Sequence, residues 1–197
     1  MTKAYLLGAL HDGTIRKITY RIVQKDREYI EFLTTEINKL GQKAWMYKEG
    51  KTRQLYVVEF SRSFLKDFHI ISQQDKIDYI RGYFDAEGGI SRNPNVRYYI
   101  YFSQKNRQDL EEVKEYIMKL GIQCGITHNP SKKIDPNYWR FFIRKESYGK
   151  FARIIGSWHP IKRHYLKDED IVRATSNEWN NMNKVSLAEA GDGSPPF

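Results

Sequence analysis

The chain has 197 residues, and 33 lysines and arginines against 24 acidic residues give it a net charge of +9. Apolar residues make up 40% of the sequence, enough for a core of ordinary size. The single cysteine, Cys124, excludes a disulfide framework and a cysteine-based zinc site. The sequence shows neither an apolar run of membrane-spanning length nor a secretory signal. We therefore expect a soluble, cytoplasmic protein, or an organellar one in a eukaryotic host.

The positive charge is concentrated in two bodies of the chain. Residues 1–74 carry 13 bases and 8 acids, and residues 75–166 carry 17 and 10, whereas residues 167–197 carry 3 and 6. This distribution favours a polyanionic partner, although an ordinary basic surface would also account for it. Aromatic residues often alternate with bases, as in "RYYIYF" at 97–102. Such strands suit a sheet with one buried face and one face turned to a nucleic acid.

Two short apolar helices are predicted at 4–13, "AYLLGALHDG", and at 79–89, "YIRGYFDAEGG". Each ends in an acid followed by glycine, and we expect Gly13 and Gly88 to adopt the left-handed conformation that stops a helix. The acids then occupy last turns, where the helix dipole is already negative and the final backbone carbonyls lack partners. A divalent cation held by clustered oxygen ligands would offset that cost.

The small residues of these two helices would allow their backbones to approach closely. Gly8 belongs to the first helix, and Gly82 and Ala86, four residues apart, belong to the second. If the helices pack side by side, their carboxyl-terminal ends meet, and the two acids meet with them.

The elements after each helix recur at a constant offset of 80 residues. A β-rich run precedes "QKDREYIEFLTTEINKLG" from residue 24 and "QKNRQDLEEVKEYIMKLG" from residue 104. The predicted middle helices, 26–40 and 106–120, stop at Gly41 and Gly121, and a second hairpin follows each. The first of these hairpins turns near "EGKT", and the second has a proline-rich turn.

The repeat predicts an α/β (α+β) protein with two pseudo-symmetric halves. Each half reads as helix, hairpin, helix, hairpin, helix. We place the N-terminal half at 1–70, a linker at 71–76, the C-terminal half at 77–166 and an extension at 167–197. The extension is expected to begin with a further helix and to end in a frayed tail.

The segments "LLGALHDG" and "IRGYFDAEG" resemble the two signature helices of single-chain LAGLIDADG homing endonucleases. The tandem repeat, the "QK" that opens each middle helix and the chain length agree with that family, and the resemblance covers residues 4–156. One departure is that Gly82 precedes Glu87 by five residues, the interval usual in the family, whereas Gly8 precedes Asp12 by four. Either the first helix packs differently by one residue, or its glycine makes another contact.

The resemblance implies a monomeric, site-specific endonuclease that cuts both strands of a long DNA site across the minor groove. Asp12 and Glu87 would be the catalytic acids and would hold Mg²⁺, with Mn²⁺ as a substitute and Ca²⁺ binding without cleavage. Gln24 and Gln104 would orient water, and Arg62 and Lys145, placed by rough alignment, would contact phosphate. A free-standing chain of this kind suggests an intron-encoded enzyme.

The resemblance also implies that the two antiparallel sheets form a saddle in the major groove, where side chains read base edges. Alternate residues of the first hairpins, and further positions in the third strand, are the expected DNA contacts. In the N-terminal half these are Lys17, Thr19, Arg21, Lys43, Trp45, Tyr47 and Arg53, and in the C-terminal half they are Ser91, Asn93, Asn95, Arg97, Tyr99 and Tyr101.

Two other functions remain open. A binding protein on the same fold, either an intron RNA maturase or a DNA-binding regulator, would use the same surfaces without cleavage. A basic protein that stacks single-stranded RNA on its aromatic strands would leave both acid–glycine helix ends unexplained. Asp85 is expected to be structural rather than catalytic, and His159 to be a packing residue.

Overall fold

The computed structural model describes residues 1–91 and 95–166, and the predicted extension at 167–197 lies outside them. The N-terminal half has a four-stranded antiparallel sheet of order β1-β2-β4-β3. Its elements are α1 (Lys3–Ala9), the 3₁₀ turn η1 (Leu10–Asp12), β1 (Gly13–Ile15), β2 (Thr19–Gln24), α2 (Arg27–Lys39), β3 (Ala44–Glu49), β4 (Leu55–Ser61) and the 3₁₀ turn η2 (Arg62–Phe64).

The C-terminal half repeats this order around a three-stranded antiparallel sheet, β5-β6-β7. Its elements are α3 (Gln73–Glu87), β5 (Gly88–Ile90), β6 (Ile100–Gln104), α4 (Arg107–Lys119), β7 (Trp139–Phe142), the 3₁₀ turn η3 (Lys145–Ser147), α5 (Tyr148–Ile154) and α6 (Pro160–Tyr165). The two-half α+β architecture predicted from the repeat is therefore confirmed. None of the helices in these described residues is long and apolar enough to cross a membrane.

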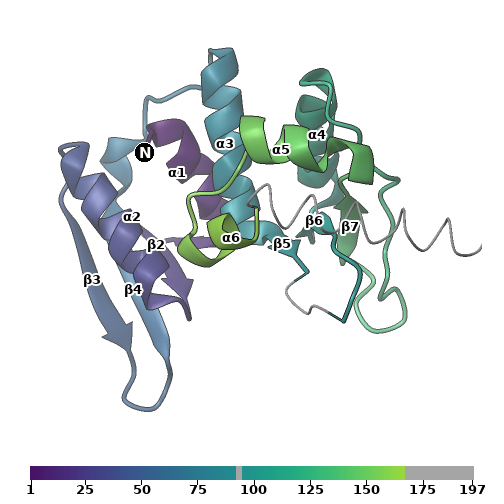
Figure 1. The fold of residues 1–197 in the computed structure, drawn as a ribbon. Coiled ribbons are helices and arrows are strands. Elements are labelled where there is room, and N and C mark those ends of the chain that lie inside the picture. Colours follow the sequence, from purple (N-terminus) through teal and green to yellow (C-terminus); the bar gives the residue numbers. More distant parts are fainter. Residues whose placement is uncertain (92–94, 167–197) are drawn as a thin grey trace, which may run out of the picture.

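Helices α1 and α3 lie side by side at the centre of the molecule, between the two sheets (Figure 1). Their backbones touch at two equivalent glycines. A Cβ at Gly8 would lie 2.0 Å from the carbonyl oxygen of Tyr79, and a Cβ at Gly82 would lie 2.0 Å from that of Tyr5. Because both contacts are with backbone, only glycine fits at either position, and the predicted close approach is confirmed.

The middle helices begin and end as the sequence predicts. Asp26 and Asn106 cap α2 and α4 by accepting hydrogen bonds from the backbone amides two and three residues further on. Gly41 and Gly121 end these helices with φ of 81° and 70°. The buried faces of these helices pack on one face of each sheet, and each half has its own core. The other face of each sheet is therefore left for a partner.

Three sequence predictions about boundaries are corrected. The predicted linker at 71–76 is partly helical, because Ser72 caps α3, which begins at Gln73. The last helix predicted for the N-terminal half is only the single turn η2. The third strand predicted for the C-terminal half is reduced to two isolated bridges, made by Cys124 and His128. The segment after His128, which contains Pro130 and Pro136, forms turns and adds no regular strand before β7.

The glycines after the two acids are required for a reason other than the one predicted. Gly13 and Gly88 have φ of −100° and −88°, so neither is left-handed. A Cβ at Gly88 would instead lie 2.1 Å from the Phe84 ring, and one at Gly13 would lie 2.9 Å from the backbone oxygen of Leu10. Space, not backbone conformation, excludes a side chain there.

A segment after α5 ties the two halves together at Asp85, which is 2% exposed. The Asp85 carboxylate accepts hydrogen bonds from the Tyr5 hydroxyl at 2.6 Å and from the backbone amides of Trp158 and His159 at 2.9 and 3.0 Å. The His159 ring stacks on Tyr29 with centroids 4.3 Å apart. Asp85 is thus a structural anchor between α1, α3 and this segment, and His159 is a packing residue, both as predicted.

Candidate active site

Asp12 lies at the end of the first central helix, where the α-helix tightens into the 3₁₀ turn η1. The Gln24 side chain, at the end of β2, donates a hydrogen bond from Nε2 to the Asp12 carboxylate. The tighter turn also explains the short interval between Gly8 and Asp12. The two glycines make the same contact, and the missing residue is absorbed where the helix narrows.

Glu87 occupies the matching place as the last residue of α3. Gln104, at the end of β6, donates from Nε2 to Glu87 Oε1 at 3.0 Å. The same strand-end glutamine therefore holds the acid in both halves. The structure thus brings together, in two pairs, four of the residues that the sequence singled out.

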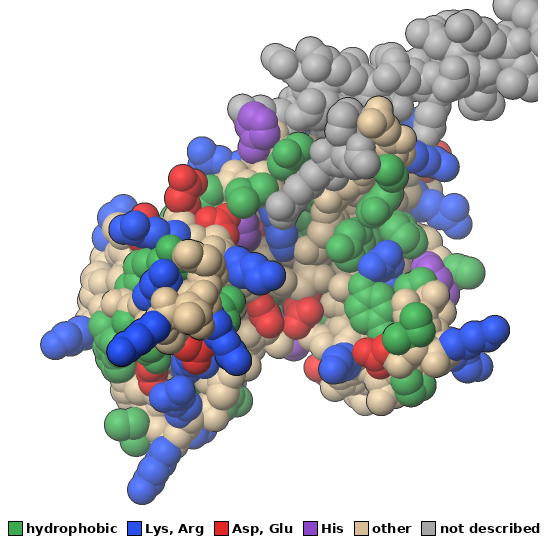
Figure 2. All heavy atoms as spheres, turned by 90° about the horizontal axis from the view of Figure 1, so that it is seen from below, with side chains coloured by type: hydrophobic (Ala, Val, Ile, Leu, Met, Phe, Trp, Pro, Cys, Tyr) green, Lys and Arg blue, Asp and Glu red, His purple; other side chains and the backbone are tan. Residues whose placement is uncertain are grey.

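The two acids share one electrostatic environment between the halves. Burial and the negative charge of Asp12 raise the pKa of Glu87 to about 7, against the opposing effects of Gln104 and Lys162. Burial also raises the pKa of Asp12, whereas the positive charge of Lys162 and the hydrogen bond from Gln24 lower it. Figure 2 shows acidic side chains next to one another in the hollow between the two sheets. A bound cation would relieve this crowding of negative charge.

Lys162, from α6, is the residue at this site that the sequence prediction missed. It is 6% exposed, and its Nζ donates to the carbonyl oxygens of Phe84, Asp85 and Gly88 at 2.8, 2.7 and 2.7 Å. The carbonyls at the end of α3 are therefore not free ligands, contrary to the sequence prediction. A buried ammonium group offsets the helix dipole there. The basic run "IKRHYL" after "SWHP" was the available signal, but its distance in sequence from α3 concealed the contact.

The acid pair fits a divalent cation only if a substrate completes the coordination. Within residues 1–91 and 95–166, no group of three or more histidine, cysteine, aspartate or glutamate side chains could hold a metal. Two carboxylates remain, and Mg²⁺ is commonly held by one or two carboxylates together with waters and substrate phosphates. The donor set therefore suits a cation that binds together with a phosphate ester.

Arg62 and Lys145 are not placed beside the acids. In β2 the Gln24 end pairs with Tyr56, whereas Thr19, at the opposite end, pairs with Ser61 next to Arg62. Arg62 donates to the carbonyl of Arg16 at 3.2 Å, in the turn before β2. Lys145 likewise follows the end of β7 that lies away from Gln104. Neither residue lies at the acid pair, because the last strand of each half runs away from the acids, and their contact with phosphate stays a prediction.

The candidate DNA contacts of the N-terminal half lie on or beside the open face of its sheet, and all of them except Thr19 are at least partly exposed there. Thr19 is only 7% exposed, and its hydroxyl donates to Glu59 at 2.5 Å, so it is less available than predicted. Arg21 pairs with Glu49 at 2.5 Å, and Trp45 and Tyr47 are exposed. The exposed turns around the sheet contain Lys17, Lys43 and Arg53.

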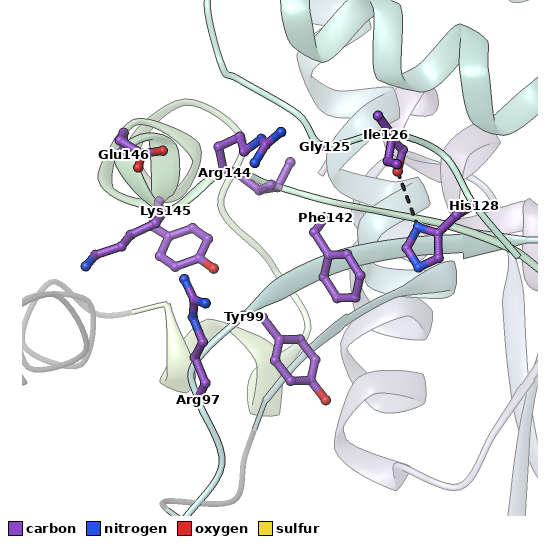
Figure 3. A pocket seen from close by; sticks show the side chains of 11 residues that line it. Arg97, Tyr99, Gly125, Ile126, His128, Phe142, Arg144, Lys145 and Glu146 are labelled. Atoms are coloured by element: carbon purple, nitrogen blue, oxygen red, sulfur yellow. Dashed lines mark hydrogen bonds between the residues drawn. The ribbon is translucent and has the colours of Figure 1, made fainter. Parts of the chain in front are cut away.

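In the C-terminal half, Tyr99 and Tyr101 lie on the open face of the sheet, because Ile100 and Phe102 between them point into the core. Asn95 and Arg97 are exposed and Ser91 is partly buried, whereas Asn93 lies outside the described residues. Arg97 and Tyr99 line a cavity of about 560 Å³ together with Lys145. Figure 3 shows Tyr99 and Phe142 between the basic side of this cavity and His128.

Comparison with protein families gives one match. Residues 75–156, most of the C-terminal half, match the model described as a LAGLIDADG-like domain. None of the curated proteins matches the chain in sequence.

Solved structures share the fold of most of the chain. The homing endonuclease I-DmoI in complex with DNA and Mn is 21% identical, with a TM-score of 0.57, over 78% of this chain and 95% of that one. Its complex with DNA and Ca is 20% identical, with a TM-score of 0.60, over 83% of this chain and 95% of that one. Full-length DUF199/WhiA from Thermatoga maritima is 16% identical, with a TM-score of 0.67, over 95% of this chain and 66% of that one. At these identities the likeness shows the fold.

Proposed function

We propose that this chain, which belongs to the LAGLIDADG family, is a site-specific endonuclease for double-stranded DNA. The observation that carries the proposal is the pair of helix-end acids, Asp12 and Glu87, each held by a strand-end glutamine. They lie between two sheets whose open faces are related by the repeat, in a chain with a net charge of +9. Two acids related by the repeat suit a duplex substrate, which has one phosphodiester backbone for each acid.

Each residue of the site has a role that follows from its contacts. Asp12 and Glu87 would hold divalent cations, Mg²⁺ in the cell, which when bound supply positive charge for phosphodiester hydrolysis. Gln24 and Gln104 fix one oxygen of each carboxylate by donating an amide N–H, and thereby orient the other oxygen. Lys162 keeps the last turn of α3 in place and adds a positive charge beside the acids. It positions Glu87 rather than touching substrate.

The two sheets would bind the major groove on either side of the acids, which places the acid pair over the minor groove between them. Basic residues of both halves would contact phosphates and supply most of the affinity. Both halves are present in one chain, so a monomer suffices for cutting two strands. The DNA complexes of I-DmoI with Mn, Mg and Ca support the substrate and the metal class by fold analogy.

A second candidate is a protein on the same fold that binds nucleic acid without cutting it, either a DNA-binding regulator or an intron RNA maturase. The likeness to DUF199/WhiA, which extends over 95% of this chain, supports this second candidate. The presence of both acids with their glutamine partners favours the endonuclease.

A two-step selection tests the proposal. Randomised duplex DNA is bound in Ca²⁺, which should occupy the acids without supporting cleavage, and the bound pool is then moved into Mg²⁺. We expect a long, quasi-palindromic consensus that is cut on both strands. A consensus that is bound tightly and left intact would contradict the endonuclease and favour the regulator. Acceleration of host intron splicing without any DNA cleavage would favour the maturase.

A further inference from the structure

The open faces of the two sheets differ at equivalent positions. Gln24 and Gln104 mark the same place in the repeat, so the register of β2 with β4 can be compared with that of β6 with β7. In the N-terminal half the cross-strand pair is Arg21 with Glu59. In the C-terminal half the same place holds Tyr101 with Phe142. A charged pair in one half is thus an aromatic pair in the other.

The centre of the N-terminal face is a hydrogen-bonded polar network, and the edge strand β3 adds the exposed rings of Trp45 and Tyr47 beside it. Glu59 accepts hydrogen bonds from Thr19 at 2.5 Å and from the Tyr47 hydroxyl at 2.9 Å. The neighbouring Arg21 donates to Glu49 at 2.5 Å. Donors and acceptors of this kind recognise base edges through hydrogen bonds.

The C-terminal face is instead a continuous group of rings, which we call the aromatic face: Tyr99, Tyr101, His128 and Phe142. The Phe142 ring lies 5.6 Å from Tyr99 and 6.2 Å from Tyr101, measured between centroids, and His128 stacks on it at 5.7 Å. The Arg140 guanidinium lies 4.3 Å from the Tyr101 centroid. The face is therefore mainly apolar at its centre.

The surroundings of the aromatic face indicate what covers it. The cavity of about 560 Å³ over Tyr99, His128 and Phe142 is also lined by Ile126, which is 77% exposed. Its basic side contains Arg97, Arg144 and Lys145 (Figure 3). An exposed apolar surface marks a binding site, and bases around it indicate a polyanion with apolar groups.

We propose that the aromatic face recognises thymine methyl groups in the major groove of its DNA half-site. This inference rests on the proposed function, because it requires a duplex on the saddle. The thymine C5-methyl is the apolar group that a base pair presents in the major groove, and apolar side chains contact it there. The polar network of the N-terminal half would read hydrogen-bonding groups instead. The two half-sites are therefore recognised by different chemistry.

Replacement of thymine by deoxyuridine tests the proposal, because it removes one methyl group and leaves base pairing intact. The change is made at each thymine of a selected duplex, in one half-site at a time, and affinity is measured in Ca²⁺. We expect a loss of about fourfold for each methyl contacted by the C-terminal half, from the usual contribution of one buried methyl-sized group. We expect a smaller loss in the N-terminal half-site, because the centre of its face is polar.

Matched variants assign the effect to the proposed rings. Phe142→Ala should weaken binding to the thymine site and remove most of its preference over the deoxyuridine site. Glu59→Ala, at the equivalent position, should leave the methyl preference unchanged and alter base preference in the other half-site, which also orients the protein on the DNA.

The outcomes separate the two proposals. Tight duplex binding with equal, negligible deoxyuridine effects in both half-sites would overturn the inference and leave the endonuclease standing. A methyl preference that survives in Phe142→Ala would also overturn it. Failure to bind duplex DNA, with preference for single-stranded RNA, would overturn both and would mean that the rings stack on unpaired bases.

Discussion

The two halves hold the same acid and glutamine in different ways. In the N-terminal half the central helix narrows into a 3₁₀ turn, and Asp12 is more exposed than Glu87. In the C-terminal half the α-helix continues to Glu87, and Lys162 binds its last carbonyls. The acid-to-glutamine hydrogen bond is nevertheless present in both. Equivalent chemistry therefore depends on where the helix end and the strand end meet, and the supporting structure can differ.

The difference arises because the segment after α5, residues 155–166, occurs in only one of the two repeats and contacts both halves. It binds Asp85 of α3 through its backbone amides, contacts α2 through the stacking of His159 on Tyr29, and provides Lys162. The pseudo-symmetry of the repeat is broken by this one segment. The predictions below ask which features the halves share and which belong to one half.

The largest expected effect comes from removing either acid. Asp12→Asn and Glu87→Gln should each lower double-strand cleavage roughly a thousandfold or more, as loss of a principal catalytic group does. DNA affinity in low salt should change little, because phosphate contacts dominate it. Strand-resolved cleavage of the selected site, with filter binding in parallel, measures both. Normal cutting by Glu87→Gln would show that the assigned site is wrong.

The close contact of α1 with α3 should be equally sensitive from both sides. Gly8→Ala and Gly82→Ala each force a Cβ to within 2.0 Å of a backbone oxygen, so we expect the free energy of unfolding to fall by about 3 kcal/mol or more. Urea denaturation gives the value. Gly149→Ala is the control, since nothing lies within 4 Å of its Cβ position, and it should be neutral or stabilising by up to about 1 kcal/mol. Unequal effects at Gly8 and Gly82 would mean that the helices are not equivalent.

Lys162→Met should act mainly on the C-terminal half, because Lys162 binds the end of α3. Three carbonyl oxygens lose their donor, and we expect unfolding to become easier by about 3 kcal/mol. Loss of the positive charge should also raise the pKa of Glu87 further, because Lys162 lowers it in the native protein. Urea denaturation and the pH dependence of cleavage measure the two effects.

Lys150→Met provides the matched control for Lys162. Lys150 donates to one helix-end carbonyl, that of Gly121, at 3.0 Å on the exposed surface. Its removal should cost less than about 1 kcal/mol and leave the pH profile unchanged. If Lys150→Met and Lys162→Met behaved alike, the buried lysine would have no special connection to the acids.

A last expected effect is a pH dependence of stability to which Glu87 contributes together with Asp12 and Asp85, whose pKa values burial also raises. The pKa of Glu87 is raised to about 7 in the folded protein, above the ordinary value of 4.5, so the folded state holds this proton more tightly than the unfolded state. The contribution of Glu87 is fully present below pH 4.5 and is lost as the pH rises from there to about 7. Thermal unfolding without metal should show this decline, excess Ca²⁺ should oppose it, and Glu87→Gln should weaken it.

The sequence predicted those parts of the fold and site that depend on local signals and on repetition. The repeat correctly placed the middle helices, α2 and α4, and the glycines that end them, Gly41 and Gly121. Lys162 could not be predicted, because its contact with Phe84 and Asp85 joins segments far apart in the chain. The alignment did not predict where Arg62 and Lys145 lie in the fold. It gives their order along the chain, but not the direction in which the strand before each of them runs.

Anomalous diffraction from Mn²⁺ in the DNA-bound protein tests the central claim most directly. The account predicts anomalous density at the Asp12 and Glu87 carboxylates, which would hold the metal next to the DNA backbone, and loss of that density in Glu87→Gln. A DNA complex with no peak at the two carboxylates, or with a peak held by other residues, would contradict it.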